Sequence, residues 1–263
     1  MANILRAMEM MTNPSNEALA REFWATSKLP ENFPRDIERA IALALPLAII
    51  KLPLLKADKV QSWLEQKGLA FSLPYDRREL MGCLVAHRGR GIIFINGTDC
   101  IEEQRYTLAH EAAHFLCDYL IPRQQVVNAL GDQIIDVLDG VRAASLAERA
   151  DAILSHVRLG AHIHLMPKQD GNEEATYIED AEHEADDLAL ELVAPRAKLV
   201  PLLEEIFARG ATESSEICRE LGAYFGLPAY ILQQIIHSGG LQAQPVSFFA
   251  DILSSIRGQQ SGR

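Results

Sequence analysis

Three residues in the middle of the chain, His110, Glu111 and His114, have the types and spacing needed to bind a metal ion and activate water. Residues four apart on an α-helix lie one above the other on the same face, so both imidazoles can bind one ion from a single turn. Glu111 follows the first histidine and can reach the edge of that site. This H-E-x-x-H pattern supplies two ligands for zinc and a carboxylate base for hydrolysis.

The same pattern can arise by chance, and a histidine pair can simply line or cap a helix. The flanking residues favour a metal site. Residues 106–109 are expected to begin the helix, with Thr107 as an N-cap or first-turn residue, and Phe115 and Leu116 are apolar enough to bury it. Polar side chains inside a buried helix need a partner, because an unpaired buried polar group costs free energy.

A catalytic zinc site usually has three protein ligands and one open position, so a third ligand must come from another part of the chain. The acidic stretch 171–191 contains nine Asp or Glu residues and no Lys or Arg. Most of these must be solvent-facing charges on a helix. Glu182 and Asp186 are four residues apart and flank the apolar side of that helix, so they are expected at its buried edge.

Glu182 is therefore the predicted third ligand. Asp186, one turn later, is expected to accept the free ring N–H of a ligand histidine, a contact that fixes the imidazole tautomer. His183 is the rival ligand, but the helical wheel places it about 100° from Glu182 and away from the apolar side. The other acidic residues of this helix are expected on its more exposed faces: Glu184, Asp187 and Glu191.

Composition restricts the class of protein. The chain of 263 residues is 48% hydrophobic and 23% charged, which is ordinary for a globular protein. Its net charge of −11 disfavours broad binding to a nucleic-acid backbone. The four cysteines form no C-x-x-C pair, and the N-terminus has no signal-peptide core, so we expect a reducing cytoplasm. The apolar run 40–55 is too short to span a bilayer and is expected to form buried helix and loop.

The regions around the H-E-x-x-H motif differ in their periodicity. Upstream, apolar residues at helical spacing predict helices over 34–45 and 57–67, and β-branched and aromatic runs then predict a small antiparallel sheet. Strands are predicted at 69–73, 81–86 and 92–96. Residues 87–91 are predicted to form the turn between the last two strands.

Downstream of Pro122 the sequence predicts mostly helix, over 124–138 and 145–159. Three histidines lie in or near this stretch: His156, His162 and His164. A lone histidine is more often structural or exposed than a metal ligand. We therefore do not expect any of the three to contact the metal.

Together, these motifs resemble a known family. The pattern R-x-x-L-A-H-E-x-x-H from Arg105 to His114, followed by E-x-x-A-D-x-x-A-x-x-L-x-x-P from Glu182 to Pro195, resembles the ImmA/IrrE family of cytoplasmic zinc metallopeptidases. Ala113 stands where that family usually has Gly, and Asp186 where it usually has Asn. The 67 residues between His114 and Glu182 form a longer separation than is usual in the family.

The resemblance implies an α+β fold: a mostly helical, zincin-like metallopeptidase domain with a small antiparallel sheet packed against the H-E-x-x-H helix. We expect an N-terminal helical segment over 1–68 and a catalytic core over 69–200 with a helical insertion near 121–177. A C-terminal helical segment would occupy 201–263.

The resemblance also implies an activity. Zn²⁺ held by His110, His114 and Glu182 would lower the pKa of its water to about 7, and Glu111 would act as general base in peptide-bond hydrolysis. Members of the family typically cleave one protein partner, often a helix–turn–helix repressor, and so switch on stress, mobile-element or phage-defence genes. No direct nucleic-acid or membrane binding is expected. Tyr177 and His183 are weak candidates for stabilising the oxyanion.

One regulatory hypothesis and two alternative functions stand beside this interpretation. Cys100, in the loop that enters the metal helix, is a possible regulatory thiol that could occupy the open position of the zinc and keep the enzyme latent. The main alternative function is a non-catalytic regulatory module that binds DNA or protein through residues 212–237, with a degenerate metal site. That segment has helix–turn–helix spacing, but Arg219 is its single Lys or Arg residue. A peptidase-fold toxin or scaffold without hydrolysis is a second alternative.

Overall fold

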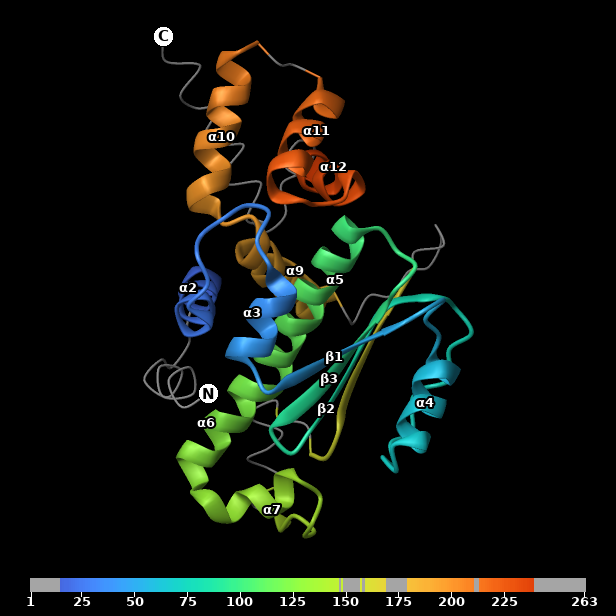
Figure 1. Cartoon of the computed structure of the whole chain (residues 1–263). Coiled ribbons are helices and arrows are strands. Elements are labelled where there is room, and N and C mark those ends of the chain that lie inside the picture. The colour runs from blue at the N-terminus through green and yellow to red at the C-terminus, as the bar shows by residue number, and fades with distance from the viewer. Residues whose placement is uncertain are drawn as a thin grey trace.

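A computed structural model describes residues 15–146, 148, 157, 159–168, 179–210 and 213–238 as helices arranged around a four-stranded sheet (Figure 1). The α+β, mostly helical fold predicted from the sequence is therefore confirmed. In chain order the elements are α2 (Asn16–Ser27), α3 (Ile37–Ala44), β1 (Leu47–Leu52), α4 (Ala57–Gln66), β2 (Leu80–His87), β3 (Arg90–Asn96), α5 (Ile101–His114), the π-helix η1 (Phe115–Leu120), α6 (Ile121–Leu130), the 3₁₀ turn η2 (Asp132–Ile134), α7 (Ile135–Leu138), β4 (His162–Pro167), α9 (Glu179–Val193), α10 (Arg196–Ala208), α11 (Ser214–Phe225) and α12 (Ala229–Ser238).

The sheet has the strand order β1-β3-β2-β4. The predicted antiparallel pairing is confirmed for β2 and β3. Strand β4, which was not predicted, also pairs antiparallel with β2, whereas β1 runs parallel to β3 and makes the sheet mixed. The run 40–55 therefore contains a strand and not only helix and loop. The local pattern could not show this, because a short apolar run fits a buried strand and a buried helix equally well, and the partner strand lies about 40 residues away.

The β2–β3 hairpin closes through Arg88 and Gly89, whose φ angles of 53° and 71° are the positive values that a two-residue type I′ turn requires. The predicted turn is thus confirmed. The predicted strand at 69–73 is wrong, because these residues form irregular chain. The side-chain amide of Gln61 on α4 satisfies that backbone instead: it donates to Phe71 O (2.9 Å) and accepts from Leu73 N (3.1 Å).

Helices cover both faces of the sheet. On one face, α4 packs against an apolar cluster that includes Leu64, Cys83 and Phe94. On the other face lies α5, with α9 and α3 beyond it (Figure 1). Side chains of β4 alternate between these two sides, because successive residues of a strand point to opposite faces: Leu165 packs with the α4 cluster and Met166 with the α5 cluster.

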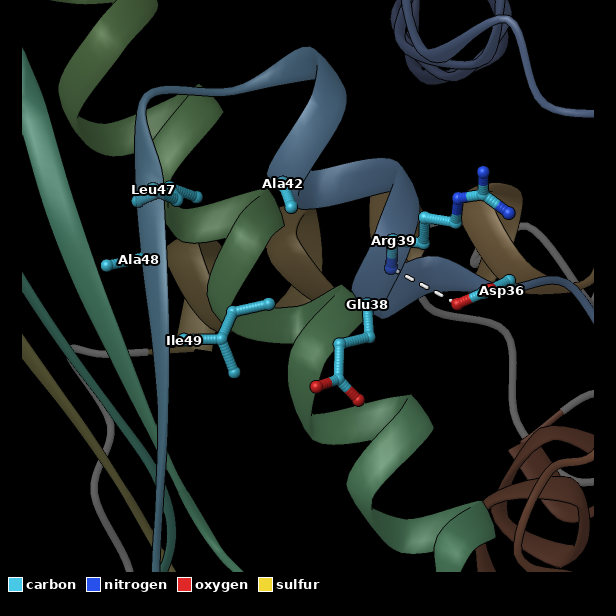
Figure 2. A pocket seen from close by; sticks show the side chains of 7 residues that line it. All are labelled: Asp36, Glu38, Arg39, Ala42, Leu47, Ala48 and Ile49. Carbon is cyan, nitrogen blue, oxygen red and sulfur yellow. Dashed lines mark hydrogen bonds between the residues drawn. The ribbon is translucent and has the colours of Figure 1, made fainter.

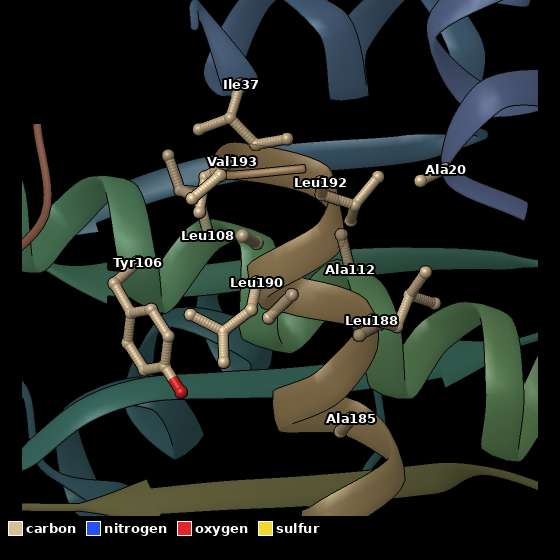
Figure 3. Packing of buried hydrophobic residues seen from close by; sticks show 14 of the residues in the cluster. Ala20, Ile37, Tyr106, Leu108, Ala112, Ala185, Leu188, Leu190, Leu192 and Val193 are labelled. Carbon is tan, nitrogen blue, oxygen red and sulfur yellow. The ribbon is translucent and has the colours of Figure 1, made fainter. Parts of the chain in front are cut away.

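Helices α5 and α9 pack directly against each other (Figure 3). The contact is lined by Leu108 and Ala112 from α5 and by Ala185 and Leu188 from α9, all at most 2% exposed. Small alanines on both helices let the two backbones approach, which brings the polar residues beside them together. One acidic residue of α9 differs from expectation: Glu191 is buried, and its carboxylate accepts the backbone N–H of Arg196 (3.1 Å).

The region after α5 departs from the predicted long helix. Gly131, with φ 79°, separates α6 from η2 and α7, and most of the predicted helix at 145–159 lies outside the described residues. Residues 162–167, expected to be within a helical region, form strand β4. Among the residues that the structure describes, no helix combines the length and the apolar character needed to cross a membrane.

Candidate metal centre

Helix α5 carries the H-E-x-x-H motif through the centre of the molecule. It begins at Ile101 and not near Thr107, because Cys100 and Glu103 form a cap in which the Cys100 backbone N–H donates to the Glu103 carboxylate (3.2 Å). The second half of the helix is fully surrounded by other elements. His110, Glu111 and His114 are at most 2% exposed, so their polar atoms must be satisfied inside the protein.

The structure brings the two motif histidines together with Glu182 of α9. Nε2 of His110 lies 3.0 Å from Nε2 of His114, and Oε2 of Glu182 lies 3.4 Å and 3.6 Å from these two nitrogens. Zinc bonds of 2.0–2.1 Å in a tetrahedral site separate the ligand atoms by about 3.3 Å. Donor types and spacing therefore fit one tetrahedral cation at the open side of this triangle.

Carboxylates hold the other ring nitrogen of each histidine. Nδ1 of His110 donates to Oδ1 of Asp186 (2.9 Å), which also accepts the Tyr106 hydroxyl (2.6 Å), and Nδ1 of His114 donates to Oδ2 of Asp118 (2.6 Å). An ionised carboxylate can only accept hydrogen bonds, so both Nδ1 atoms carry a proton. Both Nε2 atoms are then free to present lone pairs to a cation, as metal-binding histidines do.

This concentration of lone pairs and negative charge requires a cation or protons. Burial lowers the pKa of His110, but hydrogen bonds to Asp186 and Glu182 outweigh burial and raise the pKa to about 9. Burial raises the pKa of Glu182, but hydrogen bonds to His110, His114 and His164 outweigh it and hold that pKa well below its ordinary value. Protons thus occupy the cluster when no metal does, and a metal ion binds by displacing them.

Glu111 lies in a narrow slot between α5 and β2. Its side chain is fully buried, and Oε1 has no hydrogen-bond partner among the described residues. Gly82 on β2 forms the wall of the slot: a Cβ atom at that position would lie 2.6 Å from Glu111 Oε1 and 2.6 Å from Thr107 Cγ2. A glycine is therefore needed at position 82 for the Glu111 carboxylate to fit beside the histidines.

His164 is a site residue that sequence reasoning missed. It belongs to the group of His110, His114 and Glu182 whose ligand atoms all lie within 4.8 Å of one another. Burial lowers the pKa of His164, but the charge of Glu111 and hydrogen bonds to Glu111 and Glu182 raise it to about 10. The expectation that His164 stays away from the site is wrong. The available signal was the alternation of histidine and apolar residues over 162–165, which is typical of a half-buried strand.

Two other contact residues were missed although α5 offered a signal for them. Tyr106 is four residues before His110, and Asp118 is four residues after His114, so both lie on the helix face of the motif. Asp118 belongs to the π-helix η1, and such local widening is frequent at functional sites.

The remaining candidates lie away from the cluster. Cys100 caps the beginning of α5, about 15 Å along the helix axis from His110, so its thiol does not reach the open metal position in this structure. Burial also raises the pKa of Cys100, which disfavours the thiolate. His183 is exposed, and Tyr177 lies outside the described residues. The hypothesis of a Cys100 latch is therefore not supported by its position.

A separate hollow of about 530 Å³ lies between α3 and β1 (Figure 2). Its walls include Arg39, Leu47 and Ile49, and none of its lining residues belongs to the metal cluster. Because β1 and β4 are opposite edges of the sheet, this hollow is remote from His164.

Comparison with known proteins agrees with this geometry. Residues 72–174 match the family model of the IrrE N-terminal-like domain, and the match includes the whole H-E-x-x-H motif. Glu182 lies beyond the matched residues, so its place in the site comes from the structure. Neither a curated protein nor a solved structure gives a significant match to this chain. Residues 72–174 therefore form an IrrE N-terminal-like metallopeptidase domain, whose histidine pair is assembled with a glutamate from a second helix as one metal-binding cluster.

Proposed function

We propose that this protein is a zinc-dependent endopeptidase that cleaves a specific protein partner in the cytoplasm. The observation that carries the proposal is the triangle formed by His110 Nε2, His114 Nε2 and Glu182 Oε2, with edges of 3.0, 3.4 and 3.6 Å. Two nitrogens and one carboxylate oxygen form a donor set typical of catalytic zinc with an open fourth position.

Each residue of the site has a separate role in the proposed reaction. When bound, zinc would polarise the scissile carbonyl and lower the pKa of water to about 7. Glu111 is the general base: it takes a proton from the attacking water and returns it to the leaving amine. Asp186 and Asp118 orient the two histidines through their Nδ1 atoms. Burial of Glu111 keeps competing solvent away from the base.

The proposed substrate is a helix–turn–helix transcriptional repressor, whose cleavage would switch on stress, mobile-element or phage-defence genes. Resemblance to the ImmA/IrrE family is the main support for this partner. The net charge of −11 is compatible with a basic, DNA-binding protein as substrate, because opposite charges favour encounter.

The alternative of a non-catalytic DNA-binding module finds less support. Helices α11 and α12 are joined at Gly226, as helix–turn–helix spacing predicts, but they are docked onto α5, where Arg105 donates to Gly226 O (2.7 Å). Arg219 lies near the acidic side chain of Glu216 (3.8 Å). A segment with so little free positive charge makes few phosphate contacts.

A cleavage assay tests the proposal directly. The zinc-loaded full chain is incubated with the helix–turn–helix repressor encoded beside its own gene, and products are identified by mass spectrometry. We expect one or a few defined cuts, abolished by a chelator and by Glu111→Gln. Cleavage that persists in Glu111→Gln, or an intact repressor after prolonged incubation with zinc-loaded protein, contradicts the proposal.

A further inference from the structure

His164 of β4 lies between the base and the third ligand of the site. Its Nδ1 is 2.9 Å from Oε2 of Glu111, and its Nε2 is 3.1 Å from Oε1 of Glu182. Glu111 comes from α5 and Glu182 from α9, so the imidazole joins two helices through a strand. Neither the H-E-x-x-H motif nor the predicted third ligand assigns any role to this residue.

The backbone of β4 holds the ring in this place. His164 pairs with Leu84 in the antiparallel ladder between β4 and β2. Leu165, the next residue, packs on the α4 side of the sheet, so alternation directs His164 toward α5. Beyond the strand, Lys168 makes ion pairs with Glu79 (2.7 Å) and Asp99 (2.6 Å), which tie the end of β4 to its neighbours.

The ring geometry does not suit a fourth metal ligand. Two imidazoles that bind one tetrahedral ion through Nε2 diverge, with ring centroids roughly 5 Å apart for bonds of 2.0–2.1 Å. His110 and His114 meet this condition, with centroids 4.6 Å apart and an angle of 72° between the rings. His164 instead stacks on His114, at 3.7 Å and 27°. Its Nε2 contacts Oε1 of Glu182 (3.1 Å), whereas the triangle with the two motif histidines uses Oε2.

We propose that His164 is a positioning residue that couples the base to the metal ligand. Through Nε2 it holds Oε1 of Glu182, so that Oε2 faces the two motif histidines, and through Nδ1 it fixes the Glu111 carboxylate in its slot beside Gly82. This inference rests on the proposed function, in which Glu182 is a zinc ligand and Glu111 the base.

The two contacts can be separated by substitution. The amide nitrogen of Asn lies close to the place of histidine Nδ1 and that of Gln close to the place of Nε2, so each amide can keep one of the two hydrogen bonds. His164→Asn retains the donor to Glu111, His164→Gln retains the donor to Glu182, and His164→Phe retains the stacked ring without either donor. His162→Phe is the matched control, because His162 lies on the same strand and face and stacks on Tyr119 (6.3 Å).

Two measurements on the full chain report the two contacts. Zinc affinity, from competition with a chelator, reports Glu182. The affinity of the zinc-loaded protein for acetohydroxamate reports Glu111, because a metal-bound hydroxamate shares its proton with a neighbouring carboxylate in a charge-assisted hydrogen bond. We expect His164→Phe to weaken both by about 10- to 100-fold. His164→Asn weakens mainly zinc affinity, His164→Gln mainly hydroxamate affinity, and His162→Phe neither.

Three outcomes overturn the inference. The first is a His164→Phe protein with wild-type zinc and hydroxamate affinity. The second is equal loss of both affinities in His164→Asn and His164→Gln, which indicates a general structural effect. The third is loss of stoichiometric zinc in His164→Phe, with a cobalt-substituted absorption spectrum showing one nitrogen ligand fewer, which makes His164 a ligand. Failure of the proposed function looks different, because the wild-type protein itself then lacks zinc binding or Glu111-dependent cleavage.

Discussion

The two faces of the sheet are built from the same strands but bury different kinds of side chain. On the α4 face, Leu64, Cys83 and Phe94 are fully buried and apolar, and packing alone accounts for them. On the α5 face the apolar core is interrupted by fully buried ionisable groups, of which Glu111 is the extreme case at 0% exposed. Apolar packing tolerates exchange of similar side chains, whereas buried charge needs specific partners. The α5 face is therefore the one whose residue identities are set by chemistry.

The comparison predicts that the largest loss of activity follows removal of one carboxylate from the α5 face. Glu111→Gln keeps the shape of the side chain but cannot accept a proton, so kcat should fall by about 10²- to 10⁴-fold. Zinc content should stay at one per chain, because Glu111 is not part of the ligand triangle. Steady-state cleavage and metal analysis check both statements. A Glu111→Gln protein that loses zinc would place Glu111 among the ligands instead.

A smaller but comparable loss is expected from adding one methyl group to the wall of the Glu111 slot. In Gly82→Ala the new Cβ would lie 2.6 Å from Glu111 Oε1, so the carboxylate must move. A displacement near 1 Å can cost about 10²-fold in rate. We expect kcat to fall with zinc affinity retained. Ala86→Gly, on the same strand and face, is the control for altered strand packing, and a Gly82→Ala enzyme with wild-type kcat would show that the slot does not position the base.

The next largest effect is expected from substituting the carboxylates that orient the histidines. Asp118→Asn keeps the size of the side chain but removes the charge that Nδ1 of His114 contacts at 2.6 Å. Removing such a partner typically weakens metal affinity about 10- to 100-fold. Chelator competition measures the change. Asp132→Asn, an exposed acidic residue of η2, is the control for a generic change of charge. Equal zinc affinities in the wild type, Asp118→Asn and Asp132→Asn would mean that the contact between Asp118 and His114 has no influence on metal binding.

The smallest effect on the metal site is expected from substitutions on the α4 face, even where these substitutions lower the free energy of unfolding most. Leu64→Ala removes a fully buried side chain and should lower the free energy of unfolding by about 2–5 kcal/mol. Zinc affinity and kcat of the folded protein should be unchanged, since the sheet separates Leu64 from the cluster. Chemical denaturation and chelator competition on one sample give both values. A parallel fall in zinc affinity would show that the two faces are not independent.

The sequence was most informative where function and local periodicity coincide. The spacing of His110 and His114 fixes their common helix face, and the flanking alanines of α9 indicate which side of that helix carries Glu182. His164 was not predictable in the same way, because its place depends on the pairing of β4 with β2, about 80 residues apart in the chain. The parallel strand β1 was missed for the same reason. Non-local strand pairing leaves only a weak trace in a single sequence.

X-ray absorption spectroscopy at the zinc edge tests the central claim most directly. The zinc-loaded full chain should show nitrogen and oxygen ligands alone at 2.0–2.1 Å, with scattering from two imidazole rings. Glu182→Gln should then lose stoichiometric zinc in parallel metal analysis. A sulfur neighbour near 2.3 Å would place a cysteine in the site, and three imidazoles would make His164 a ligand. Either result, or zinc bound unchanged by Glu182→Gln, would contradict the cluster of His110, His114 and Glu182.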